Sequence, residues 1–112
     1  MRIVNLCKHN VDVVSPSGAV KTVPPSGVEA RVATTRVFDE PVVLDDGFVV
    51  QISKPHYGEV EGLPAPQEGV MFVVSGQTLA ALNGSRPDVF SPGNLLRGPD
   101  GQPKGCEGLS KG

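Results

Sequence analysis

Aromatic residues are scarce in this sequence, which contains no tryptophan, one tyrosine and four phenylalanines. A core must therefore be built mainly from valine, leucine and isoleucine, and the β-branched members of that set favour strands. Long apolar runs are also missing, and none approaches the roughly 20 residues that a membrane-spanning helix needs. The first ten residues lack an apolar segment of signal-peptide length, so we expect a soluble intracellular protein.

Neither sign of charge dominates the chain, which has 10 Lys and Arg against 12 Asp and Glu and a net charge of −2. A protein that tracks polymeric nucleic acid needs a basic block or stripe, so we exclude that partner. Cysteine is equally sparse: Cys7 and Cys106 lie far apart and form no CxxC pair. This spacing argues against a zinc site and a disulfide framework, and we expect two buried free thiols, no metal and no cofactor.

Motifs of known catalytic machinery are absent: the chain has no GxSxG, HExxH, Walker or GxGxxG sequence. Each of the two histidines, His9 and His56, also lacks a recognisable nucleophile or acid beside it. A hydrogen-bonded structural role is the first interpretation of both histidines, contact with a ligand is the second, and catalysis is the third.

What the chain does have is turn residues, since 14 glycines and 11 prolines stand among 112 residues. Short apolar clusters recur between them at intervals of about ten residues, a pattern typical of hairpins. We therefore predict one domain over residues 1–112: a mainly β, compact antiparallel barrel or sandwich of hairpins with one short helix. The tail after about residue 98 is glycine-rich, and we expect it to be less ordered.

The most apolar run, residues 70–74, has apolar side chains on both alternating faces and is predicted to be a buried central strand. Residues 63–66, which contain two prolines, precede it as a stiff segment, and residues 56–61 before them are predicted to be a polar loop. Ser75 is expected to cap a helix over residues 76–82. The other predicted elements are two strands, over residues 2–6 and 29–38, and three hairpins: 11–14 with 20–23, 42–44 with 48–53 across Asp45-Asp46-Gly47, and 94–97 with 104–109.

The candidate site residues are the polar and aromatic side chains beside these strands and turns. Arginine presents a planar donor fork that suits phosphate or carboxylate, and three arginines lie outside any charge run; local ion pairs with neighbouring carboxylates are the alternative. Tyr57 could stack on a base, and His56 or Glu59 could bind polar edges. The full set of candidate ligand-binding residues is Arg31, Arg36, His56, Tyr57, Glu59 and Arg86.

Five segments together, VNLCKHNVDVV, VPPSGVEARV, YGEVEGLPAPQEGVMFVVS, RPDVFSPGN and GCEGLS, carry a resemblance over nearly the whole chain. The chain resembles a group of small proteins of unknown activity encoded by bacteriophages and prophages. That group opens on NLTPH, so Asn5, Leu6 and His9 fit its pattern, whereas Cys7-Lys8 replace its Thr-Pro. The resemblance implies a viral source and a compact domain, and it implies no reaction. For a soluble protein from such a source we expect the host cytoplasm as its location.

Three functions from different classes remain open. The leading hypothesis is a non-enzymatic phage protein that sequesters a small anionic ligand, such as a nucleotide signal of host immunity, in a pocket between subunits. The first alternative is a small phosphodiesterase or ring nuclease that uses His9 or His56 as its acid or base. The second alternative is a protein-binding inhibitor or minor virion component. We also expect a homo-oligomer, because few aromatics and many strand edges leave apolar surface to cover.

Overall fold

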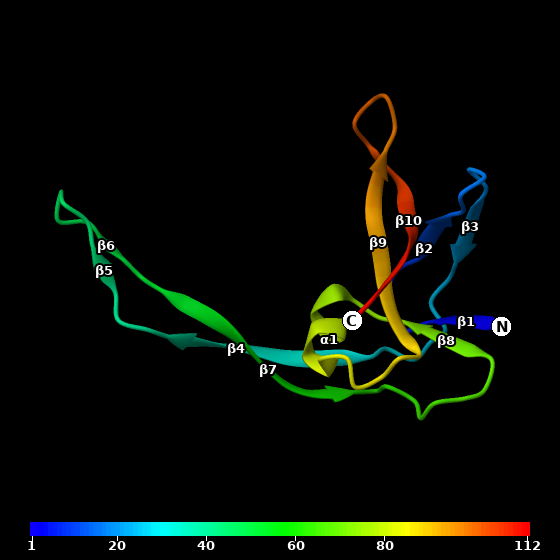
Figure 1. Ribbon diagram of the computed structural model, residues 1–112, viewed down its shortest axis with the longest axis horizontal. Helices are drawn as coiled ribbons and strands as arrows, with labels where there is room; N and C mark the ends of the chain where they lie inside the picture. The colour runs from blue at the N-terminus through cyan, green and yellow to red at the C-terminus, as the bar shows by residue number, and fades with distance from the viewer.

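The computed structural model describes the backbone of residues 1–112 and every side chain except that of Pro103. The protein is mainly β with one short helix, as the sequence predicts (Figure 1). Its elements are β1 (Arg2–Asn5), β2 (Val11–Val14), β3 (Val20–Val23), β4 (Arg31–Phe38), β5 (Val42–Val43), β6 (Val49–Val50), β7 (Ser53–Glu61), β8 (Val70–Val73), α1 (Gly76–Leu82), β9 (Val89–Arg97) and β10 (Pro103–Lys111).

Six of the strands form one sheet in the order β1-β8-β9-β10-β2-β3, which curves until it is nearly closed. The β2–β3 and β9–β10 pairs are antiparallel hairpins, whereas β1–β8, β8–β9 and β10–β2 are parallel pairs. Only antiparallel pairing was expected from the sequence. The parallel β8–β9 pair is possible because α1 lies between the two strands in the chain and supplies the crossover connection that parallel neighbours need.

Strand β8 confirms the prediction of a strand covered on both faces. Phe72 and Val74 pack on one side, in a cluster with Leu6, Leu79 and Val89. Val73 packs on the other side, in a cluster with Val11 and Cys106. Phe72, Val73 and Val74 are at most 1% exposed, so this strand joins the two halves of the core.

The two strands of the C-terminal hairpin are longer than the predicted strands over residues 94–97 and 104–109. Strand β10 runs over nine residues and lies inside the sheet, paired with β9 on one side and with β2 on the other. Leu109 packs against one core cluster, and the Cys106 side chain is buried in it. Pairing on both sides outweighs the low strand propensity of its glycines.

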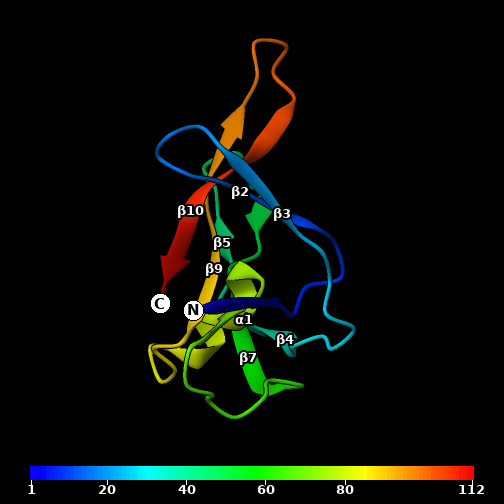
Figure 2. The same ribbon diagram turned by 90° about the vertical axis from the view of Figure 1, so that its right-hand side faces the viewer.

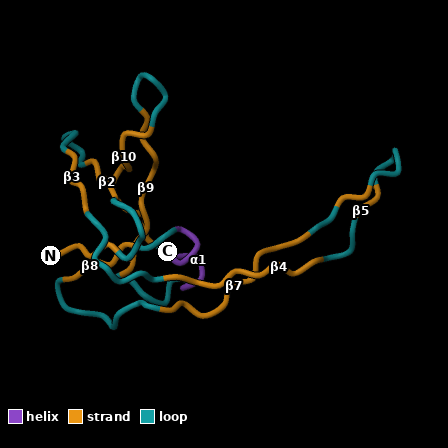
Figure 3. The backbone as a smooth tube through the Cα atoms, turned by 180° about the vertical axis from the view of Figure 1, so that it is seen from behind, coloured by secondary structure: helices purple, strands orange, loops and turns teal.

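The long hairpin from β4 to β7 projects from this body as an arm (Figures 1 and 3). Strands β4 and β7 pair with each other alone, and β5 and β6 continue the ribbon beyond them to the Asp45-Asp46-Gly47 turn. The prediction that residues 56–61 form a polar loop is therefore wrong, because these residues belong to β7. The loop prediction failed because the partner strand, β4, lies far away in the sequence.

The arm makes the molecule elongated, with extents of 55 × 40 × 22 Å. The radius of gyration is 17.7 Å, whereas a compact domain of this length has a radius of about 13 Å. Among the described residues, no helix has the length and apolar character needed to cross a membrane.

Candidate functional site

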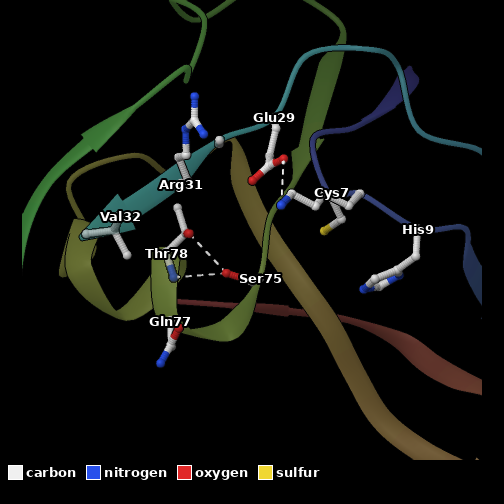
Figure 4. A pocket seen from close by; sticks show the side chains of 10 residues that line it. Cys7, His9, Glu29, Arg31, Val32, Ser75, Gln77 and Thr78 are labelled. Atoms are coloured by element: carbon white, nitrogen blue, oxygen red, sulfur yellow. Dashed lines mark hydrogen bonds and ion pairs between the residues drawn. The ribbon is translucent and has the colours of Figure 1, made fainter. Parts of the chain in front are cut away.

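A hollow of about 310 Å³ lies where the arm leaves the body (Figure 4). Three segments meet there: the loop after β1, the start of β4 and the start of α1. We call this hollow the junction cleft. Its lining residues are Cys7, Lys8, His9, Glu29, Ala30, Arg31, Val32, Ser75, Gln77 and Thr78.

Asn5 fixes the first of these segments, although it does not line the cleft. The side chain is 1% exposed, and its Nδ2 donates to the carbonyl oxygens of His9 and Val23, each at 2.9 Å. Its Oδ1 accepts from the backbone N–H of Cys7 at 2.8 Å. A buried side chain with three such bonds holds the loop that carries Lys8 and His9 in one conformation.

The start of β4 is held against the end of β1 and the end of β7. The backbone N–H of Ala30 donates to the Leu6 carbonyl at 3.0 Å, and the Ala30 side chain is buried in the core. Gly62 has a φ of +80°, and a Cβ atom added to it would lie 2.2 Å from the Glu29 carbonyl oxygen. Only glycine allows this close approach, so Glu29 and Arg31 enter the cleft from a rigid backbone.

The start of α1 forms the third wall through its cap. The Ser75 side chain accepts from the backbone N–H of Thr78 at 3.3 Å, and the two hydroxyls lie 3.0 Å apart (Figure 4). Thr78 is 1% exposed, whereas Gln77 is exposed at the rim. The cap thereby uses both hydroxyls, and the Gln77 amide stays available to a ligand.

Charge in the cleft is mixed, with Lys8 and Arg31 as cations and Glu29 as the carboxylate. Lys8 Nζ lies 3.8 Å from Glu29 Oε2, and the Lys8 side chain is 76% exposed, so this ion pair contributes little to stability. Arg31 is exposed and forms no ion pair with any described side chain. Both cations can turn to an incoming anion at small cost.

Cys7 does not supply a nucleophile to the cleft. Burial raises the pKa of its thiol, and the nearby Glu29 carboxylate raises this pKa further. The thiolate is therefore disfavoured at neutral pH. Cys7 and Cys106 are both free thiols, as the sequence predicts; Cys106 is buried and Cys7 is half-buried.

Five of the six candidate residues from the sequence lie on the arm, spread along β4 and β7. Arg31 also lines the junction cleft, and it shares a second, open hollow of about 510 Å³ with Glu59. Arg36 is exposed further out, where its Nη1 donates to Ser53 Oγ at 3.4 Å. Half-buried Tyr57 lies opposite Thr34, and exposed His56 lies opposite Thr35, so the two side chains point to opposite faces of the ribbon.

Arg86, the sixth candidate, is occupied by a neighbour. Its Nε and Nη2 donate to the two carboxylate oxygens of Asp88, each at 2.9 Å, and Nη2 also donates to the Pro64 carbonyl at 2.8 Å. The hydrogen bonds from Arg86 hold the pKa of Asp88 below its usual range. This arginine ties the proline segment to the start of β9, as the ion-pair alternative anticipated.

Sequence reasoning missed Lys8 and Gln77 as candidates. Lys8 was passed over because it departs from the pattern of the resembling group, and Gln77 because nothing in the sequence aligns α1 with the loop after β1.

Among the described side chains, no group of three or more His, Cys, Asp or Glu residues could hold a metal ion. Comparisons with protein-family models, with curated proteins and with solved structures find no match to this chain.

Proposed function

We propose that the protein is a phage-encoded, non-enzymatic binding protein that sequesters a small anionic ligand in the junction cleft. The observation that carries this proposal is the convergence of Lys8 and Arg31 from separate segments on one hollow, beside the free amide of Gln77. Guanidinium and ammonium groups bind phosphate oxygens, and an amide discriminates the polar edge of an attached group. A nucleotide presents both features, so nucleotide signals of host immunity are the class to test first.

A hydrolytic role has less support from the same cleft. His9 Nδ1 lies 3.0 Å from the Asn10 carbonyl oxygen and donates to it, so Nε2 is the one ring nitrogen of His9 that could act as a base. His56 is exposed on the arm, away from the cleft lining. Neither imidazole ring makes a hydrogen bond with a serine, threonine or cysteine side chain among the described residues, since Thr35 donates to the backbone carbonyl of His56 and not to its ring. A ring nitrogen bonded to a hydroxyl or thiol is what nucleophile activation requires.

Calorimetric titration tests the proposal, with inorganic pyrophosphate and a panel of linear and cyclic nucleotides as probes. We expect saturable heat for at least one member, and at least tenfold weaker binding in Arg31→Gln and in Lys8→Gln, because each removes a charge-assisted hydrogen bond. Arg36→Gln is the matched control: it removes an exposed arginine from the same strand outside the cleft and should bind as the wild type does. Absence of heat from every member at micromolar protein would contradict the proposal.

Recovery of the ligand separates sequestration from cleavage. We expect a bound nucleotide, incubated with excess protein and released by heating, to return with its mass unchanged. Conversion to a smaller product would overturn sequestration in favour of the phosphodiesterase alternative.

A further inference from the structure

The outer end of the arm, residues 38–52, has more exposed apolar surface than any other part of the chain. We call this segment the arm tip. Seven apolar residues of the tip are between 38% and 65% exposed: Phe38, Val42, Val43, Leu44, Phe48, Val49 and Ile52. Monomeric surfaces rarely gather so many exposed apolar residues on one short segment, and such a cluster marks an interaction site.

The tip is poorly stabilised by its own pairing. Strands β5 and β6 contain two residues each and pair only with each other. A two-stranded ribbon is marginal in water, and it needs a third strand or a packed face to be stable. The tip therefore needs a partner surface that packs against its exposed apolar side chains, and its own chain does not provide one.

The distribution of charge along the molecule indicates which surface covers the arm tip. The tip carries four carboxylates and no lysine or arginine: Asp39, Glu40, Asp45 and Asp46. At the opposite end of the long axis, the first and last strands of the sheet, β1 and β3, face the viewer in Figure 2. Between them lies a hollow of about 370 Å³, which we call the seam.

The seam complements the tip in both polarity and charge. Ile3, Val23 and Pro24 give it apolar lining, and Arg2 and Lys21 give it two exposed cations. Neither cation forms an ion pair with a described side chain. None of the described residues that line the seam is a carboxylate; Thr22, which does line it, donates a hydrogen bond to Asp12 on the neighbouring strand.

The seam is also the place where the nearly closed sheet stays open. The outer edges of β1 and β3 pair with no other strand, apart from one bridge between Asn5 and Pro25. An unpaired edge is a template for an added strand. In Figure 1 the arm points away from β1 and β3, so a chain cannot place its own tip in its own seam.

We propose that the arm tip of one copy docks into the seam of a second copy, head to tail, with its carboxylates facing Arg2 and Lys21. The tip and the seam are different surfaces, so the contact is heterologous and builds a ring or a filament. This inference does not depend on the proposed ligand.

Charge reversal tests the contact on the full chain by sedimentation velocity over a concentration series. The tip variant is Glu40→Lys with Asp45→Lys, and the seam variant is Arg2→Glu with Lys21→Glu. We expect wild-type protein to exceed the monomer mass of 11.7 kDa with rising concentration. Each variant alone should associate at least tenfold more weakly, because like charges then meet at the contact.

An equimolar mixture of the two variants is the decisive sample. The reversed tip then meets the reversed seam, and the native tip of one variant meets the native seam of the other, so the mixture should regain wild-type association. The control Lys104→Glu with Lys111→Glu changes net charge as the seam variant does and should leave association intact. Wild-type protein that stays at 11.7 kDa, variants that associate normally, or a mixture without rescue would each overturn the proposal.

Discussion

At the scale of single residues, the cleft depends on side chains that never touch its interior. Asn5 makes its three hydrogen bonds to backbone groups of the loop and of β3, and Gly62 gives the Glu29 carbonyl room. Lys8 and Arg31 supply the charge but hold little of the structure. Substitutions at the two kinds of position should therefore affect different measurements.

Asn5→Ala should lower the free energy of unfolding by about 3 kcal/mol, because two carbonyls and one N–H lose their partner in a buried place. Urea denaturation followed by circular dichroism measures this loss. Asn10→Ala is the matched control, since Asn10 is exposed and should tolerate the change. Equal stability of the two variants would show that Asn5 does not organise the loop.

The hydrogen bonds between Arg86 and Asp88 should make the stability of the fold depend on pH. The folded pKa of Asp88 is lowered, mainly by the hydrogen bonds from Arg86, so the pair stabilises the fold at pH values above the unfolded pKa near 3.9 and loses this effect as pH falls through the folded pKa. Asp88→Asn should be less stable than the wild type by roughly 1–3 kcal/mol at pH 7. The difference should shrink below about pH 4. Asp100→Asn, on an exposed turn, serves as the control; a gap independent of pH would contradict the assignment.

At the scale of elements, local chemistry made several parts of the fold predictable. The β2–β3 hairpin matches its predicted residues because two valine-rich runs flank a Pro-Ser-Gly turn, and α1 matches because Ser75 caps it. Residues 56–61 and the parallel pairs were missed because their partners are distant in the chain. The cleft was missed in part for the same reason: Arg31 was a candidate, but Lys8 and Gln77 reach it only through the parallel β1–β8 pairing and the crossover helix.

Gly47 tests the tip as an element. Its φ is +87°, and an added Cβ would meet no other atom, so the backbone conformation alone opposes substitution. Gly47→Val should weaken the β5–β6 pairing by roughly 1–2 kcal/mol, because a β-branched residue resists this conformation. Faster hydrogen exchange at the Leu44 and Gly47 amides, which bond across the turn, measures the effect.

Gly47→Asn is the control for the same position, because asparagine tolerates positive φ. Its exchange should stay near that of the wild type. Slower or unchanged exchange in Gly47→Val would show that the turn does not need the left-handed conformation.

At the scale of the whole molecule, the body and the arm are stabilised in different ways. The body has two core clusters joined by β8, whereas the arm tip, residues 38–52, contributes no side chain to either cluster. The elongated shape therefore reflects a projecting ribbon attached to an independent core. The net charge of −2 does not reveal the acidic arm tip, where every charged side chain is a carboxylate.

Shortening the arm should leave the body folded. Val37 and Lys54 face each other across the ribbon, so residues 38–53 can be replaced by Asn-Gly, which closes a two-residue hairpin. We expect the thermal midpoint to shift by less than about 4 °C, which corresponds to under about 1 kcal/mol. X-ray scattering of the monomer at high salt should give a radius below 17.7 Å. Loss of the body's cooperative unfolding would contradict this division.

The most direct test of the proposed function is an NMR titration of the isotope-labelled protein with inorganic pyrophosphate. The account predicts saturable shifts of the backbone amides at residues 7–9, 29–32 and 75–78, which surround the junction cleft. Shifts concentrated around Arg36 and Tyr57 on the arm would contradict it. So would the absence of saturable shifts both with millimolar pyrophosphate and with every nucleotide of the calorimetric panel.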